Sequence, residues 1–324
     1  MINQYPAPWV PYFQQTVNQE LESKGSPPFI AMQLATIDSE SGFPHVRTVI
    51  YRGFMFDDET TNVLTCCTDK RMLKYDQLKK NDKFEIVCYF PFVRKQFRFT
   101  GHARLIDCEN KPKIELPVAK SSYHSSDEED EEEEKEEKHE KHEEDESNAQ
   151  CKNQKQETSH LCHDDDNDNM NDDSLELKVN GKISSEVSGS KEKPLIYPII
   201  SPSQLATLKT TDDSFITLSS LVCYPPTNED WDQEIDRQWN NLSKNLKQSF
   251  RKPTPLSEMN DTKLKLIDSI NRGVDGKKDI EGLKNFAIIG LFIELADFVD
   301  LDKDRRYIYS KDTSGTWSET EVCP

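Results

Sequence analysis

The stretch that decides the fold reads HVRTVIYRGF (residues 45–54), NVLTCCTDKRMLKY (62–75) and VRKQFRFTGHARL (93–105). Runs of branched and aromatic residues bounded by turn residues are typical of β-strands. Basic and amide side chains recur beside the expected turns. Such a spacing can line a pocket for a phosphate and a flat polar ring, so these residues suggest a flavin nucleotide site.

The rest of the chain predicts a mainly β (α+β) fold. Short strands with few helices between them favour a closed barrel over a parallel sheet. The longest apolar run, residues 286–299, is short for a membrane span and contains Glu294 and Asp297, so we expect a buried strand. The expected strands are 29–37 and 45–56, paired in a hairpin around SESGFP, then 63–67, 84–90, 96–106, 285–300, 307–309 and 317–322. The expected helices are 9–23, 70–78 and 231–250.

Charge is unevenly distributed along the 324 residues, which include 60 acidic and 41 basic side chains. Between residues 121 and 193 there are 25 acidic side chains against 9 lysines and no arginine. This segment has few apolar side chains to offset a backbone entropy cost of about 1–2 kcal/mol per ordered residue. We therefore expect a largely disordered acidic insertion over residues 111–228, which separates the two parts of one domain, 1–110 and 229–324.

Two roles remain open for the acidic insertion: a solvated segment without a specific role, or a docking surface for basic partners. Ser125 and Ser126 each precede a glutamate by three residues, a spacing that suits an acid-directed kinase. Mass spectrometry that finds both serines unmodified in the cell would exclude that hypothesis.

The cysteines indicate a reducing compartment. Eight are scattered without a paired framework, and the sequence MINQYPAPWVPYF lacks the basic start and apolar core of a signal peptide. The cytosol or the nucleus fits best. Chance clustering is favoured over a metal site for Cys151, His160, Cys162 and His163, because they lack zinc-finger spacing.

Two arginines on one expected strand are the first candidate ligands. Strict alternation places Arg47 and Arg52 on opposite faces, so a bulge or a strand end would have to bring them together. An arginine fork suits a phosphate or a ring carbonyl because it donates two charged hydrogen bonds.

The turn at residues 68–71 is the second candidate. It lies between a strand and a helix, where free backbone N–H groups and the helix dipole attract an anion. Lys70 and Arg71 would close this phosphate cradle. Gln96 begins a later strand and offers a donor and an acceptor to the pyrimidine edge of a flavin.

In combination these motifs resemble the pyridoxamine 5′-phosphate oxidase-like FMN-binding split-barrel family. The resemblance covers roughly residues 5–108 and 229–324. It rests on RTVIYR (residues 47–52), Leu64-Thr65, Lys70-Arg71, Gln96, Asp304-Arg305, Trp317 and Pro324. The segment DRQWNNLSKNLKQSFRKPTP (236–255) is similar to an element of the family's fungal and cyanobacterial branch, with Lys247 where that branch usually has arginine.

This resemblance implies a split β-barrel with flanking helices, FMN as the cofactor, and a homodimer with FMN at the subunit interface. It assigns the FMN phosphate to Thr65, Lys70 and Arg71 and the ring to Gln96, with Arg305 approaching from the C-terminal strand. The implied cofactor-binding residues are Arg47, Thr48, Val49, Ile50, Arg52, Leu64, Thr65, Lys70, Arg71, Gln96 and Arg305. No nucleic acid or membrane partner is expected.

Departures from the family concern the substrate site. The oxidases carry R-L-H-D-R near the C-terminus, whereas this chain has LDKDR at residues 301–305, where only the last two positions match. The leading hypothesis is therefore an FMN-binding, oxidoreductase-like protein with an unknown substrate. Two alternatives stay open: a true pyridoxamine/pyridoxine 5′-phosphate oxidase that makes pyridoxal 5′-phosphate, and a non-enzymatic flavin-binding or acidic-tail interaction module.

Overall fold

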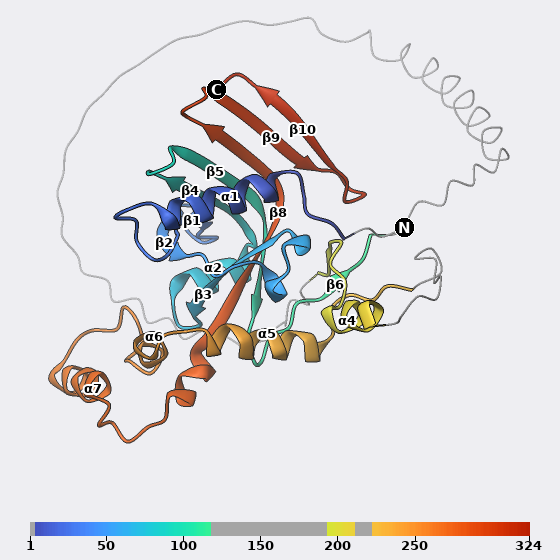
Figure 1. Ribbon diagram of the computed structural model, residues 1–324. Coiled ribbons are helices and arrows are strands. Elements are labelled where there is room, and N and C mark those ends of the chain that lie inside the picture. The colour runs from blue at the N-terminus through green and yellow to red at the C-terminus, as the bar shows by residue number, and fades with distance from the viewer. Residues whose placement is uncertain (1–3, 118–192, 211–221) are drawn as a thin grey trace, which may run out of the picture. The chain divides into compact units, whose positions relative to one another are not determined.

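A computed structural model describes residues 4–117, 193–210 and 222–324. Most of the expected acidic insertion, including Ser125, Ser126 and the Cys and His residues at 151–163, lies outside the described residues. The described part is a mainly antiparallel sheet with flanking helices (Figure 1), which confirms the predicted fold class.

Eight strands form the sheet, in the order β10-β9-β8-β5-β4-β1-β2, with β3 paired to β8. The gap between β2 and β3 is bridged by the residues that follow β2, because Phe54 pairs with Leu64. The sheet therefore closes into a barrel that is split between β2 and β3. The strands are β1 (Ala31–Ile37), β2 (Pro44–Ile50), β3 (Val63–Asp69), β4 (Lys83–Phe90), β5 (Lys95–Ile106), β8 (Phe286–Asp300), β9 (Arg305–Lys311) and β10 (Trp317–Val322).

Strand β8 connects the two parts of the chain. It pairs with β5 along most of its length, with β3 over its first half and with β9 over its second half. Its residues are almost all buried, because side chains from both faces of β8 pack into hydrophobic core clusters. The prediction of a buried strand over residues 286–299 is confirmed.

Helix α1 (Trp9–Glu22) packs its apolar face on the barrel core (Figure 1). Trp9 and Phe13 are fully buried, and the Phe13 ring meets Phe97 and Phe99 edge to face at centroid distances of 5.3 and 5.4 Å. Each such side chain contributes about 1.5–3 kcal/mol on burial. The predicted helix at 9–23 is confirmed.

Several of the other helices differ from the prediction. The expected helix at 231–250 is two helices, because Ser243 interrupts it and accepts a hydrogen bond from the Leu246 N–H as the N-cap of the second. The helix expected from residue 70 begins only at Leu73. Helices α4 and α7 were not predicted. The helices are α2 (Leu73–Lys80), α4 (Pro202–Thr210), α5 (Asn228–Asn240), α6 (Lys244–Ser249) and α7 (Asp261–Arg272), with short 3₁₀ turns at Met55–Asp57, Glu59–Thr61 and Asp279–Asn285.

The folded domain extends beyond the boundaries expected from charge. Strands β6 (Ile114–Glu115) and β7 (Leu195–Ile196) form a short parallel pair. The Tyr197 side chain is buried in the core, and its hydroxyl donates to the Ile293 carbonyl at 3.1 Å. The apolar run PLIYPII at 194–200 explains this packing.

None of the helices that the structure describes has the length and apolar character needed to span a bilayer. Six cysteines fall among the described residues, and all six are free thiols.

Candidate functional site

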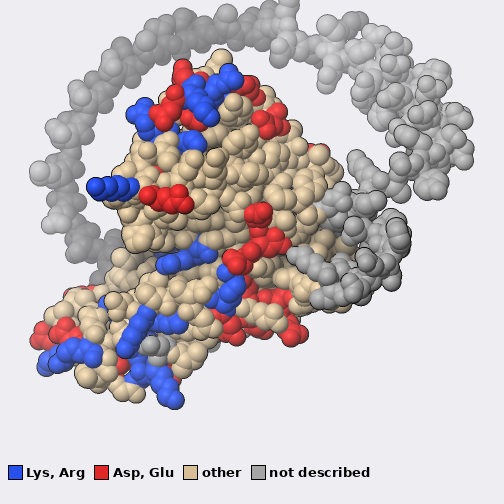
Figure 2. Space-filling view, viewed as in Figure 1, with Lys and Arg blue, Asp and Glu red and all other residues tan. Residues whose placement is uncertain are grey.

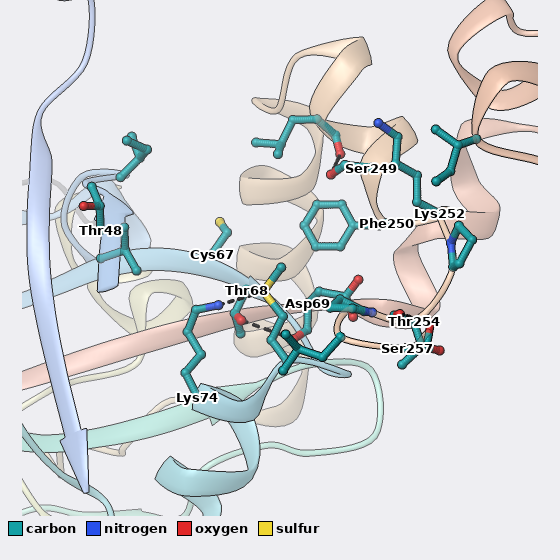
Figure 3. Close-up of a pocket in the computed structure, with 18 of the residues that line it drawn as sticks. Thr48, Cys67, Thr68, Asp69, Lys74, Ser249, Phe250, Lys252, Thr254 and Ser257 are labelled. Atoms are coloured by element: carbon teal, nitrogen blue, oxygen red, sulfur yellow. Dashed lines mark hydrogen bonds between the residues drawn. The ribbon is translucent and has the colours of Figure 1, made fainter. Parts of the chain in front are cut away.

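A cavity of about 510 Å³ lies beside the barrel (Figure 3). One side is built by β2, β3 and the start of α2, and the facing side by α6, α7 and the loop between them. Figure 3 shows Thr48, Cys67, Thr68, Asp69 and Lys74 on the strand side, and Ser249, Phe250, Lys252, Thr254 and Ser257 on the facing side. Val49, Ile50, Arg52, Met72, Leu246, Pro253, Pro255, Leu256, Met259, Lys263 and Ile267 complete the lining. The volume falls within the usual range for small-molecule sites, about 300–1,000 Å³.

Positive charge dominates the cavity lining. Its basic side chains are Arg52, Lys74, Lys252 and Lys263, and no described residue places a carboxylate within ion-pair distance of any of them. The lining carboxylate, Asp69, is already bonded to the Arg71 guanidinium at 2.6 and 2.9 Å. Lys and Arg also gather at the lower left of Figure 2, where Figure 1 places α6 and α7. Such a lining attracts an anion.

Lys74 is the most informative of these cations. It lies in the first turn of α2, and among the described residues its Nζ donates only to the thioether of Met72 at 2.8 Å, which is a weak acceptor. Burial, and then the nearby Arg47 charge, hold the Lys74 pKa below its ordinary value. The helix start adds backbone N–H groups, because its N-cap residue, Met72, makes no side-chain cap. A phosphate here would meet a desolvated cation and a helix N-terminus together.

The two strand arginines do different things. Arg47 donates to Thr36 Oγ1 at 2.6 Å and Gln77 Oε1 at 2.9 Å, which fixes it behind the cavity beside α2. Strand β2 ends at Ile50, and the chain then turns so that Arg52 lines the cavity. The Arg52 guanidinium makes no hydrogen bond or ion pair with any residue that the structure describes. The structure therefore does not bring the two arginines together: Arg52 lines the cavity with Thr48 and Ile50, and Arg47 does not.

Lys70 and Arg71 lie at the predicted turn, but their side chains have other partners. Lys70 bonds to Asp107 at 3.3 Å and Glu109 at 3.0 Å. Arg71 donates to the carbonyls of Phe250 (3.1 Å) and Lys252 (2.9 Å) and so anchors the facing wall of the cavity. The basic side chain that reaches the lining from this region is Lys74, which sequence reasoning missed.

The remaining predicted residues divide into two groups. Thr48, Val49 and Ile50 line the cavity, whereas Leu64 and Thr65 are fully buried behind it.

Gln96 and Arg305 lie far along the sheet from the cavity of their own chain. Gln96 pairs with Val299, near the opposite end of β8 from Phe286, which faces Asp69 at the cavity. Arg305 is exposed and bonds to Glu321 at 2.9 Å.

Cys67 is a lining residue that sequence reasoning did not single out. Burial raises the pKa of its thiol to about 12, so the side chain is a neutral thiol at physiological pH. Its place on β3 between the cavity and the core follows from alternation with the fully buried Cys66.

Residues 6–107 match the model of the pyridoxamine 5′-phosphate oxidase family, FMN-binding domain. This segment contains β1 to β5 and the strand side of the cavity. Residues 6–107 are thus identified as a pyridoxamine 5′-phosphate oxidase-type FMN-binding domain.

The chain is also similar to other known proteins and to a solved structure. An uncharacterized protein of Saccharomyces cerevisiae is 29% identical over 346 residues, which cover 98% of each chain. Pyridoxine/pyridoxamine 5′-phosphate oxidase 2 of Arabidopsis thaliana is 33% identical over 95 residues, 29% of this chain and 46% of that protein. The crystal structure of a pyridoxamine 5′-phosphate oxidase-related, FMN-binding protein from Nostoc punctiforme has the same fold, with a TM-score of 0.53 and 18% identity over 98% of each chain.

Proposed function

We propose that the cavity between the barrel and the α6–α7 segment binds FMN, and that the protein is an FMN-dependent oxidoreductase. The observation that carries this proposal is Lys74, a partly buried cation on the cavity wall with no carboxylate partner among the described residues. A buried charge without a partner is costly, so its place is best explained by an anionic ligand.

The residues present fit FMN. Lys74 and the first turn of α2 would hold the phosphate, with Arg47 close behind. Val49, Ile50 and Phe250 offer apolar contact to a flat ring, and Arg52 offers two donors to its polar edge. When bound, FMN supplies hydride-transfer chemistry, and the protein supplies binding, orientation and electrostatics.

The described lining contains no carboxylate free to move a proton. Asp69 is held by Arg71, and the Cys67 thiol is neutral. The chain's own contribution is therefore to bind the cofactor, to exclude water with the apolar facing wall, and to present a positive field. That field favours the anionic forms of bound molecules.

A second copy of the chain is part of the proposal. Gln96 and Arg305 cannot reach the cavity of their own chain along β8, so any contact they make with the cofactor must come from a partner subunit. Light scattering on the purified protein is expected to give the mass of a dimer. A monomer at micromolar concentration would remove both residues from the cofactor site.

The deciding experiment is an absorbance spectrum of the protein purified from cells and again after incubation with excess FMN and desalting. We expect a flavin spectrum that remains with the protein. Absence of flavin after reconstitution would refute the proposal.

Turnover assays on the flavin-loaded protein separate the reaction classes. Formation of pyridoxal 5′-phosphate from pyridoxamine 5′-phosphate would identify a true oxidase. A bound flavin that shows no turnover with any reductant would indicate a non-enzymatic flavin-binding module.

A further inference from the structure

The direction of Arg52 depends on a backbone turn that is fastened to β3. The Arg52 N–H donates to the Thr65 carbonyl at 2.9 Å, and the Thr65 N–H donates to the Gly53 carbonyl at 2.9 Å. Gly53 has a φ of 95°, a conformation that side chains disfavour. The turn is thus hydrogen-bonded to β3 at Thr65, so contacts that fix the position of Thr65 also fix the backbone of Arg52.

The Thr65 hydroxyl has both of its roles taken inside the protein. It donates to the Gly53 carbonyl at 2.8 Å and accepts from Gln238 Nε2 at 3.1 Å. The residue is fully buried and does not line the cavity. Its hydroxyl is therefore placed to support the turn rather than to contact a ligand.

Helix α5 supplies the other end of this chain of hydrogen bonds. Gln238 Nε2 also donates to Glu234 Oε1 at 3.0 Å, and the Glu234 side chain is only 1% exposed. Arg237 grips the same carboxylate with two bonds of 2.7 Å and donates to the Phe54 carbonyl at 3.3 Å. Residues 234, 237 and 238 share one helix face because they are three and four apart.

We propose that Gln238 and Glu234 are positioning residues that act on the ligand in the cavity through Thr65 and Arg52. The path runs from Glu234 through Gln238 and the Thr65 hydroxyl to Gly53, while Arg237 secures Phe54. Both carbonyls that follow Arg52 are thereby tied to α5. The half-buried Arg52 side chain is thus aimed into the cavity by a helix that contributes no residue to the lining.

The proposal rests on the proposed function, because FMN affinity is its readout. The test is a double-mutant cycle with Gln238→Leu, Arg52→Gln and the combined variant, each titrated with FMN. Gln233→Leu, an exposed glutamine on the same helix, is the matched control. We expect Gln238→Leu to weaken FMN binding roughly five- to tenfold, and to have less than about a twofold effect when Arg52 is already glutamine.

Thr65→Val provides a second route, because it removes the hydroxyl while keeping the side-chain shape. It is expected to behave like Gln238→Leu, including the loss of effect in the Arg52→Gln background, and it replaces that variant if Gln238→Leu does not fold. Equal effects with and without Arg52 would show a merely structural role and overturn the inference, as would unchanged affinity. A wild-type protein that binds no FMN would overturn the proposed function and this inference together.

Discussion

Replacement of Lys74 by methionine separates two effects of this unpaired cation: the stability that its burial removes and the FMN affinity that its charge provides. Methionine keeps the long apolar stem and removes the charge. Truncating one partner of a desolvated charge pair costs about 2–5 kcal/mol. Lys74 is only partly buried, so we take the low end, about 2 kcal/mol, which corresponds to a roughly 30-fold loss of FMN affinity.

The same change is expected to stabilise the flavin-free protein. Burial holds the folded-state pKa of Lys74 below its ordinary value. The unfolded chain therefore binds the proton more tightly, and the charge reduces stability at every pH below the unfolded pKa, about 10.4. Removal of the charge should raise the melting temperature at pH 7 while FMN binding falls.

Flavin fluorescence titrations and thermal melts, each at several pH values, test both expectations. Wild-type affinity should fall as the pH rises through the Lys74 pKa, because the neutral amine no longer attracts the phosphate, and this dependence should be absent in the variant. Lys79→Met, an exposed lysine on the same helix, is the control. FMN affinity within twofold of wild type in Lys74→Met would refute the placement of the phosphate at α2.

Two further predictions concern the barrel. The Asp297 carboxylate, 7% exposed, bonds to Arg306 at 2.8 and 2.9 Å and to Arg98 at 3.0 Å, so Asp297→Asn should cost about 3 kcal/mol in urea unfolding. Burial acts to raise the Asp297 pKa, but the two arginines outweigh it and lower the pKa, so this stabilisation is present above about pH 4 and is lost as the pH falls through the folded-state pKa. A variant with unchanged acid unfolding would contradict this account. Gly101→Ala would place a Cβ 1.9 Å from the Phe292 carbonyl oxygen, a backbone contact that only strand separation can relieve, and should cost about 3 kcal/mol or more. A loss below 1 kcal/mol would show that β5 and β8 yield there.

The strands were predictable because their signals are local. Alternation and branched residues marked β4 and β5 to within one residue. The split of residues 231–250 into two helices depends on Ser243, whose capping role is equally local but was masked by the apolar periodicity around it. Helix α7 was missed although its signals are also local, since Asn260 caps its start and Gly273, in the left-handed conformation, ends it.

The cavity was less predictable because it depends on distant contacts. The different positions of Arg47, behind the cavity, and Arg52, in its lining, depend on the bonds of Arg47 to Thr36 and Gln77 and on the end of β2 at Ile50. The clamp between Arg71 and Lys252 joins residues 181 positions apart, and no local pattern reports it. The Asp69 side chain accepts a hydrogen bond from the Arg71 N–H and extends the turn before the helix. Because α2 therefore begins at Leu73 and not at residue 70, Lys74 lies in its first turn.

Strand β8 also has a consequence for how the protein is made. It is the central partner of β3, β5 and β9, yet it begins only at Phe286, so during synthesis the ribosome must add at least 180 residues after β5 before the pairing can form. Until then the edges of β3 and β5 stay open, and exposed strand edges invite association between nascent chains. Pairing over such a sequence separation is intrinsically slow. Newly made chains therefore pass through a long period in which the edges of β3 and β5 are open to other chains.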